Sequence, residues 1–416
     1  MSENREILLV VVGEARGSYA LARAFHEAYR CKTIAVVKDV VHPIQHSRLV
    51  TPVVVPGLFD DAEVMVGALE AVAAENPGRT LVLLSNDDRG VQVFVDHAER
   101  LSERFAVSVC TADALEPCAD KIRFAEVCER LGIATPTTVQ VDLTQLRASG
   151  GRAALDDLVV DLDFPVVAKP ASSAQYERSE TPSVEKASYL VDRAALDDLL
   201  VRLLDTGYEG IFLVQETIAG DDTWKRTLTA YRDTSGTITM MVTGQILLEG
   251  YQGATGYGVL TTWDDEAVEA VTRFLDDVGY VGFAQADYKV DPRTGRHVFF
   301  EINPRIGSGN YYATAAGANP ARAVVTDLVE HRSTGTVRGA DGVLYLLVPF
   351  RLLLRYIADP ALKDRLRQVR RSGRLANLWR YRLDSGWRRR YVVEGMIWSA
   401  WYKLPRQRSQ IGANGL

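Results

Sequence analysis

The chain has 416 residues, of which 47% are hydrophobic and 25% charged, and its formal net charge is −6. These values are typical of a soluble protein of two or three domains, and the acidic charge argues against a protein that coats nucleic acid. No apolar run reaches the roughly 20 residues of a membrane span, and the N-terminal run lacks the flanks of a signal peptide, so we expect a cytoplasmic protein. The four cysteines have no CxxC spacing, which predicts buried thiols rather than a zinc site or a disulfide framework: Cys31, Cys110, Cys118 and Cys128.

The first part of the chain alternates short apolar runs with helical patterns. Apolar strands and amphipathic helices are predicted in turn at 7–13, 18–29, 32–38, 62–75 and 80–87. This alternation predicts an α/β domain with a parallel sheet over residues 1–113. Its glycines do not form GxGxxG, so we expect this domain to contact a substrate rather than a dinucleotide.

Polar residues lie at the ends of the predicted elements of this domain, where α/β sheets place ligands. Ser47 and Arg48 occur in HSRLV, and Asn86 and Asp87 follow the apolar run LVLLS. Arg48 could bind a carboxylate, and an ordinary surface arginine is the alternative.

The next part changes character. A helix that begins near Lys121 is closed by Gly132, and Pro136 prevents its continuation. FPVVAKP then predicts a buried strand that ends in Lys169, followed by a polar, Ser- and Thr-rich segment at 171–188 that is expected to be a mobile loop. A helix near 192–204 and the buried strand in GIFLVQETIAG complete this part.

A third part is rich in β-strand patterns. TLTAYRD and TITMMVTGQILL are separated by a TSG turn, which predicts an antiparallel hairpin, and a helix follows at 265–277. DPRTG then forms a turn between the strands that contain Asp287 and Glu301, so these strands are predicted to be antiparallel neighbours.

The segment FFEINPR gathers oxygen ligands. Side chains two positions apart in a strand share a face, so Glu301 and Asn303 are expected on one face, with Phe300 and Ile302 on the other. With Asp287 nearby, this set suits Mg²⁺, which prefers carboxylate and amide oxygens. The guanidinium of Arg305 suits a phosphate or a carboxylate. A solvated strand end with an Asn-Pro turn and a surface arginine is the alternative.

Lys121, Lys169 in VVAKP, LVQETIAG, AQADYK and FFEINPR occur in an order that resembles the ATP-grasp family of carboxylate–amine ligases, over about residues 115–320. The resemblance implies an N-terminal α/β domain followed by a two-lobed ATP-grasp domain of α+β type. The small lobe would span 114–204, the large lobe with the Mg²⁺ and ATP site 205–345, and a basic C-terminal extension 346–416.

The resemblance also implies roles for individual residues. Arg305 and Lys169 would be catalytic, with Arg305 facing the transferred phosphoryl group or the acyl phosphate. Asp287, Glu301 and Asn303 would hold Mg²⁺, with Mn²⁺ as the alternative ion. ATP as a substrate would contact Lys121, Lys169, Lys186, the connector Gln215, Glu216, Thr217 and Ile218, and Asp222 or its neighbour Asp221 at the ribose. The amino-acid substrate would contact Ser47, Arg48, Arg305 and Asn310.

Within that family, LARAFHEAY, HSRLV, VVAKPASSAQYE and FFEINPRIGSGNYYATAAGANP are similar to D-aspartate ligases of peptidoglycan cross-bridge synthesis. This similarity implies that ATP activates the carboxylate of D-aspartate as an acyl phosphate, which an amine of a peptidoglycan precursor peptide then attacks. The loop after Lys169 is poor in glycine, unlike the phosphate lid of many ATP-grasp enzymes. A ligase that makes another amide or a soluble dipeptide, and a non-catalytic ATP-binding regulator, are the alternatives.

The C-terminal extension interleaves arginines with tryptophans at 379, 387, 398 and 401. Such a segment could bind nucleic acid, an anionic membrane surface or an anionic precursor. The resemblance favours the last two, and no nucleic-acid partner is expected. A helical appendage that packs its tryptophans on the core and leaves its arginines in solvent is the alternative.

Overall fold

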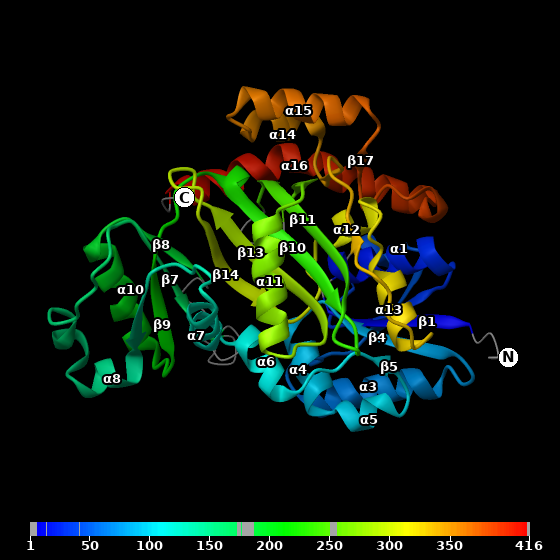
Figure 1. Cartoon of the computed structure of the whole chain (residues 1–416), viewed down its shortest axis with the longest axis horizontal. Coiled ribbons are helices and arrows are strands. Elements are labelled where there is room, and N and C mark those ends of the chain that lie inside the picture. The colour runs from blue at the N-terminus through cyan, green and yellow to red at the C-terminus, as the bar shows by residue number, and fades with distance from the viewer. Residues whose placement is uncertain are drawn as a thin grey trace.

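The computed structural model describes residues 6–13, 15–40, 42–172, 176, 187–249 and 256–413, and the strands of these ranges form three sheets. Figure 1 shows the N-terminal sheet and the smallest sheet at opposite sides of the molecule, with the largest sheet between them and the C-terminal helices across the top. This arrangement confirms the predicted fold class: a parallel α/β domain, a two-lobed α+β domain and a C-terminal extension.

The N-terminal sheet is parallel, with the order β3-β2-β1-β4-β5. Its strands are β1 (Ile7–Val12), β2 (Thr33–Val37), β3 (Val50–Val54), β4 (Thr80–Ser85) and β5 (Ala106–Val107), and its helices are α1 (Ala15–Tyr29), α2 (His42–Gln45), α3 (Ala62–Ala74), α4 (Asp88–Asp96) and α5 (Ala98–Ser102). The strand β3 was not predicted, because Pro52 interrupts its pattern; it is an edge strand, where proline is tolerated.

Two helices connect this domain to the rest: α6 (Ala112–Ala119) and α7 (Lys121–Leu131). The carboxylate of Asp120 caps α7. Gly132 ends the helix with φ 66°, as the sequence predicts. The ring of Phe124 on α7 lies 5.4 Å from that of Phe274, on a helix of the large lobe. Both connecting helices therefore pack with the large lobe, whereas we had predicted them in the small lobe.

The small sheet is antiparallel, with the order β6-β9-β7-β8. It consists of β6 (Thr138–Asp142), β7 (Val166–Pro170), β8 (Ser188–Leu190) and β9 (Ile211–Glu216), covered by α8 (Leu143–Ala148), η1 (Gly151–Leu155) and α10 (Arg193–Thr206). The predicted boundary after residue 204 is wrong, because β9 pairs with β6 on one side and β7 on the other. The small lobe therefore extends to residue 216.

The large sheet has the order β14-β13-β10-β11-β12-β16-β17, and β15 pairs with β11. Its strands are β10 (Lys225–Arg232), β11 (Ile238–Leu248), β12 (Gly258–Thr261), β13 (Gly282–Val290), β14 (His297–Asn303), β15 (Val337–Arg338), β16 (Leu344–Leu346) and β17 (Leu375–Ala376). Its helical segments are η2 (Asp222–Trp224), α11 (Asp265–Asp277), α12 (Tyr311–Ala315) and α13 (Pro320–Leu328). The predicted β10–β11 hairpin and the helix at 265–277 are confirmed.

The C-terminal segment is part of the fold rather than a separate appendage. It contributes β17 to the large sheet, together with α14 (Phe350–Tyr356), α15 (Pro360–Arg371), η4 (Arg382–Asp384) and α16 (Trp387–Ala413). Within the described residues, no helix is both long and apolar enough to cross a bilayer.

A buried ion pair attaches this segment to the N-terminal domain. Asp384 and Arg389 are at most 2% exposed, and Arg389 Nε lies 2.9 Å from Asp384 Oδ2. The same carboxylate accepts hydrogen bonds from the hydroxyls of Tyr19 and Ser47, each at 2.8 Å, and from the backbone N–H of Arg48 at 2.6 Å. Nearby, the ring of Trp379 stacks on Tyr19 and is buried. For this tryptophan, the structure agrees with the interpretation of the extension as a helical segment that packs its tryptophans on the core.

We expect Asp384→Ala to lower the free energy of unfolding by about 3–5 kcal/mol, because it leaves the buried Arg389 charge without its partner. Glu394→Ala is the matched control: it breaks the solvent-exposed pair with Arg380 and should cost less than about 1 kcal/mol. Urea unfolding followed by tryptophan fluorescence measures both values, and equal effects would contradict the anchoring role.

Candidate active site

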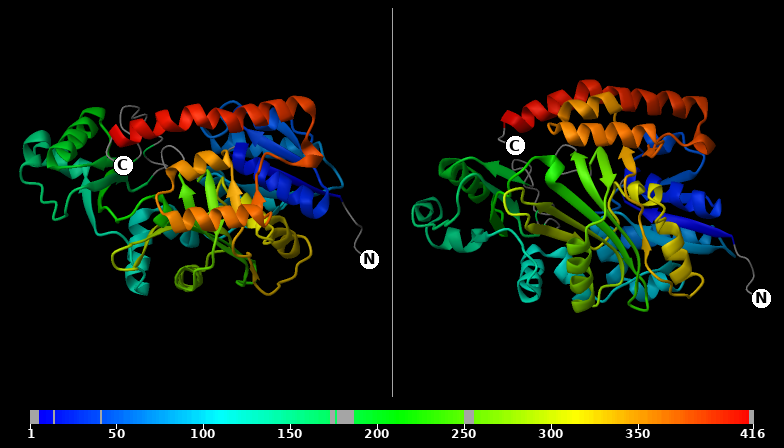
Figure 2. Two further views of the ribbon diagram at one scale, coloured as in Figure 1. Left: turned by 90° about the horizontal axis from the view of Figure 1, so that it is seen from above. Right: turned by 45° about the horizontal axis from the view of Figure 1, so that its top comes forward.

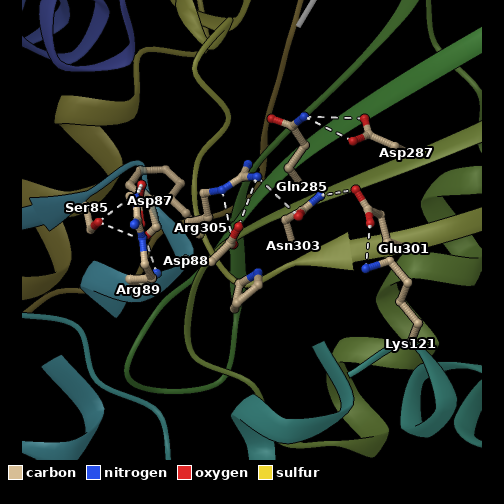
Figure 3. A network of polar contacts seen from close by, with 12 residues as sticks. Ser85, Asp87, Asp88, Arg89, Lys121, Gln285, Asp287, Glu301, Asn303 and Arg305 are labelled. Carbon is tan, nitrogen blue, oxygen red and sulfur yellow. Dashed lines mark hydrogen bonds and ion pairs between the residues drawn. The ribbon is translucent and has the colours of Figure 1, made fainter. Parts of the chain in front are cut away.

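Charged side chains from three parts of the fold meet at the end of β14. Asp287 on β13 is directly opposite Glu301 on β14, as the sequence predicts, and Gln285 is opposite Asn303. Paired residues in neighbouring strands share a face, so these four side chains lie on one side of the large sheet (Figure 3).

Glu301 is the centre of this cluster. The Nζ of Lys121, at the start of α7, lies 3.9 Å from Glu301 Oε2, and the amide nitrogen of Asn303 donates to Oε1 at 3.2 Å. Burial alone would raise the pKa of Glu301, but Lys121 and Lys169 together with the amide outweigh burial and lower the pKa. This carboxylate is therefore ionised.

Asp287 behaves differently. Burial, and then the charge of Glu301, raise the pKa of Asp287 to about 7, and Gln285 Nε2 lies 3.3 Å from its Oδ1. Two carboxylates this close repel each other, so a bound cation would stabilise the ionised pair. The paired strands bring all three predicted metal ligands, Asp287, Glu301 and Asn303, to one place.

Asp287, Glu301 and Asn303 offer oxygen ligands of the kind that Mg²⁺ prefers. Among the described residues no group of three or more His, Cys, Asp and Glu side chains is placed to hold a metal ion. Mg²⁺ is usually held by one or two carboxylates and completes its shell with waters and substrate phosphates. Two carboxylates and one amide on one face of the sheet therefore fit Mg²⁺.

A β-bulge corrects the expected alternation of β14. The register shifts after Asp287, so Tyr288 pairs with Phe299 and Phe300 is the extra residue. Phe299 and Ile302 are in the core, whereas the ring centroid of Phe300 lies 6.0 Å from Lys169 Nζ. The prediction that Phe300 shares a face with Ile302 is therefore wrong.

Lys169 extends from the small sheet toward the same cluster. Burial, and then the charge of Lys121, lower the pKa of Lys169 to about 8 even though Glu301 opposes this change. Two ammonium groups thus lie around one carboxylate, which leaves positive charge available for an anionic ligand.

Arg305 connects the cluster to the N-terminal domain. Its Nε lies 3.2 Å from Asp88 Oδ1, at the start of α4, and its Nη2 donates to Asn303 Oδ1 at 3.2 Å. Burial would lower the pKa of Arg305, but Asp88, Glu301 and Asp287 raise it. Sequence reasoning missed Asp88, although the residue before it, Asp87, was noted as lying at a strand end.

A second N-terminal residue, also missed, reaches the loop that follows β14. Arg16 lies at the start of α1, and its Nη2 donates to Ser308 Oγ at 3.0 Å. In the same loop, a Cβ at Gly307 would lie 1.6 Å from Gln285 Oε1, so only glycine allows Gln285 to reach its place beside Asp287. In the sequence, Gly307 is the residue that could have indicated a close approach to this loop.

The predicted connector after β9 is held by its neighbours. Gln215 Nε2 donates to Thr138 Oγ1 at 2.9 Å, and Glu216 Oε1 accepts from the N–H of Thr137 at 2.9 Å. Ile218 is buried, and its carbonyl accepts from Lys289 Nζ at 2.8 Å. Burial and then Lys225 lower the pKa of Lys289 to about 8, a second perturbed lysine that sequence reasoning missed.

The remaining predicted contacts lie in several places. The hydroxyl of Thr217 is buried without a hydrogen-bond partner in the described part of the chain, and Asp222 Oδ2 accepts from the N–H of Glu249 at 3.1 Å. Asn310 is fully buried, and its amide donates to the carbonyl of Gly307 at 2.8 Å. Lys186 lies outside the described residues, as does most of the polar segment expected to be mobile.

Ser47 and Arg48, the predicted substrate residues of the N-terminal domain, contact the C-terminal segment. Both hold Asp384, Ser47 through its hydroxyl and Arg48 through its backbone, and the Arg48 side chain is exposed beside Gly386.

The similarity to one curated protein extends over nearly the whole chain. D-aspartate ligase of Enterococcus faecium (strain Aus0004) is 30% identical over 406 residues, which cover 95% of this chain and 95% of that protein. The carbamoyl phosphate synthase large chain of Thermus thermophilus is 25% identical over 244 residues, which are 54% of this chain and 21% of that one. No family model matches the chain.

Solved structures share the fold at low identity. N5-carboxyaminoimidazole ribonucleotide synthetase in complex with ADP has a TM-score of 0.58 at 13% identity, covering 88% of this chain and 85% of that one. L-amino acid ligase from Bacillus licheniformis has a TM-score of 0.54 at 16% identity, covering 79% and 75%. The chain thus belongs to the ATP-grasp carboxylate–amine ligases, the family of its D-aspartate ligase relative, and is an ADP-forming carbon–nitrogen ligase.

Proposed function

We propose that the protein activates a carboxylate of D-aspartate with ATP and joins it to an amine of a peptidoglycan precursor peptide, releasing ADP and phosphate. The observation that carries this proposal is the 30% identity to D-aspartate ligase along 95% of both chains. This match includes the N-terminal domain as well as the two ATP-grasp lobes, so it supports a shared substrate as well as shared ATP chemistry.

The cluster around Glu301 suits the first half of this reaction. Lys121 and Lys169 would bind the ATP phosphates, and Asp287, Glu301 and Asn303 would hold Mg²⁺. When bound there, Mg²⁺ would supply positive charge against the negative charge that develops during phosphoryl transfer. No protein nucleophile is required, because the substrate carboxylate attacks the γ-phosphorus and ADP leaves.

The acyl phosphate then reacts with the amine. The amine nitrogen attacks the carbonyl carbon, the C–O bond to phosphate breaks, and the amine loses a proton as the amide forms. Arg305 would stabilise the negative oxygens of the acyl phosphate, and the carboxylates of Asp88 and Glu301 keep its guanidinium charged and fixed in place.

Two arginines at one loop, Arg305 within it and Arg16 from α1, favour a substrate with two carboxylates. Arg305 lies at the start of the 305–308 loop, and Arg16 contacts Ser308 at its end. Arg16 and Asp88 follow β1 and β4, which are neighbours in the parallel sheet, so both lie at the carboxyl edge, where such sheets bind ligands. Arg16 would bind the carboxylate that does not react, while Arg305 serves the one that does.

ATP turnover with defined substrate pairs tests this function. With Mg²⁺, D-aspartate and a UDP-linked muramyl pentapeptide, we expect release of ADP, no AMP, and a mass increase of the peptide equal to one aspartyl residue. Glu301→Gln is the control for the site, because it removes a carboxylate from the metal set and should abolish turnover while the far-UV circular dichroism spectrum stays unchanged.

Other outcomes separate the alternatives. ADP release with a different amino acid or with a small amine would keep the ligase chemistry and replace the substrate. ATP binding without turnover for any pair would contradict an enzyme and support a regulator.

A pH series tests the role of Lys169. Its pKa of about 8 means that the ammonium loses its proton above that pH, so the affinity for ATP should fall by up to tenfold per pH unit between about pH 8 and pH 9.5. In Lys169→Arg the guanidinium stays charged over this range, so the decrease in ATP affinity with pH should disappear. The absolute affinity will differ, because a guanidinium and an ammonium group differ in shape. Calorimetric titration with ATP measures both curves, and identical pH dependence in the two proteins would contradict the phosphate contact.

Arg16→Met tests the second carboxylate contact. Loss of one charge-assisted hydrogen bond should raise KM for D-aspartate roughly ten- to hundredfold, with little change in KM for ATP. Ser308→Ala is the control, because it removes the neutral partner of Arg16 and should have the smaller effect. An equal rise in both KM values for Arg16→Met would point to a general disturbance of the site.

A further inference from the structure

The last described helix exposes four large aromatic side chains. On α16, Trp387 is 76% exposed, Tyr391 81%, Trp398 58% and Tyr402 63%. Large aromatic rings are costly to leave in water, and an exposed group of them commonly marks an interaction site.

These four residues form one stripe along the helix. With 3.6 residues per turn, their positions lie within roughly 60° of one another around the helix axis. With a rise of 1.5 Å per residue, the stripe is about 22 Å long. We call these residues, Trp387, Tyr391, Trp398 and Tyr402, the aromatic stripe.

The opposite side of α16 is attached to the protein. Val393, Ile397 and Leu404 are buried, and Arg389 forms the buried ion pair with Asp384. Figure 2 shows α16 along the outer edge of the molecule in both views. The helix is therefore held in a fixed orientation with the aromatic stripe outward.

Positive charge surrounds the stripe. Residues 346–416 contain 16 Lys and Arg but only 4 Asp and Glu, a net charge of +12 in a chain whose total is −6. The exposed cations on α16 include Arg388, Arg390, Lys403 and Arg406. Glu394, on the same helix, is paired with Arg380 at 2.8 Å.

We propose that α16 binds the surface of an anionic lipid membrane, with the aromatic stripe in the headgroup region and the flanking cations on lipid phosphates. Tryptophan and tyrosine favour the membrane interface, and each nearby Lys or Arg adds attraction to anionic lipid. This contact goes beyond the ligase reaction, because the stripe belongs to the C-terminal segment and not to the cluster around Glu301.

The charge pattern favours a membrane over a second copy of the chain. A symmetric dimer through the stripe would place the same patch on both partners, so the basic flanks would face each other. Like charges brought together across an interface oppose association, whereas anionic headgroups neutralise them.

Vesicle flotation tests the proposal with the full-length protein. We expect the wild type to float with vesicles of equal parts phosphatidylglycerol and phosphatidylcholine, not with phosphatidylcholine alone, and less at high salt. Trp387→Ser combined with Trp398→Ser, and separately Arg390→Glu combined with Lys403→Glu, should each weaken binding about tenfold or more.

Matched controls change the same properties on other faces. Val159→Ser removes an exposed apolar side chain of the small lobe, and Arg104→Glu reverses an exposed charge of the N-terminal domain, so both should bind vesicles like the wild type. Retained ATP turnover in the α16 variants confirms that they are folded.

Two results would overturn the proposal. One is vesicle binding that is absent in the wild type or unchanged in both α16 variants. The other is a wild-type dimer in sedimentation velocity that the tryptophan variant converts to a monomer, which would make the stripe a contact between copies.

Discussion

The repulsion between two carboxylates, Asp287 and Glu301, is the constraint around which the site is organised. The β13–β14 register places them opposite each other, and burial raises the cost of ionising both. Positive groups from three separate parts offset this cost: Lys121 on α7, Lys169 on the small sheet, and Arg305 after β14. Two of these groups, Lys121 and Lys169, are also the ones proposed to bind the ATP phosphates.

The parts of this site that depend on local chain geometry could be predicted from the sequence. The alternation of strand side chains places Glu301 and Asn303 together, and the DPRTG turn makes Asp287 their neighbour. The bulge at Phe300 could not be predicted in this way, because a bulge is a property of how two strands pair. Asp88 was missed for a similar reason: it meets Arg305 across 217 positions of sequence.

Non-local pairing also explains the errors in the lobe boundaries. The strand β9 follows α10 without any composition change that marks its partners, and only its hydrogen bonds to β6 and β7 assign it to the small lobe. The C-terminal extension shows the same limit. Trp379 and Arg389 are buried, whereas Trp387 and Trp398 are exposed. The segment therefore fits neither of the two interpretations drawn from composition, in which the tryptophans either all pack on the core or are all available for binding.

The buried Asp384 has a consequence for how the protein is made. Its carboxylate accepts a hydrogen bond from Tyr19 across 365 positions of sequence, so this contact cannot form before residue 384 has been synthesised. Chains fold from the N-terminus as they emerge from the ribosome, so the N-terminal domain emerges with the surface around Tyr19 uncovered. The surface around Tyr19 therefore stays open to chaperones or to misassembly until the segment around Asp384 has been synthesised and covers it.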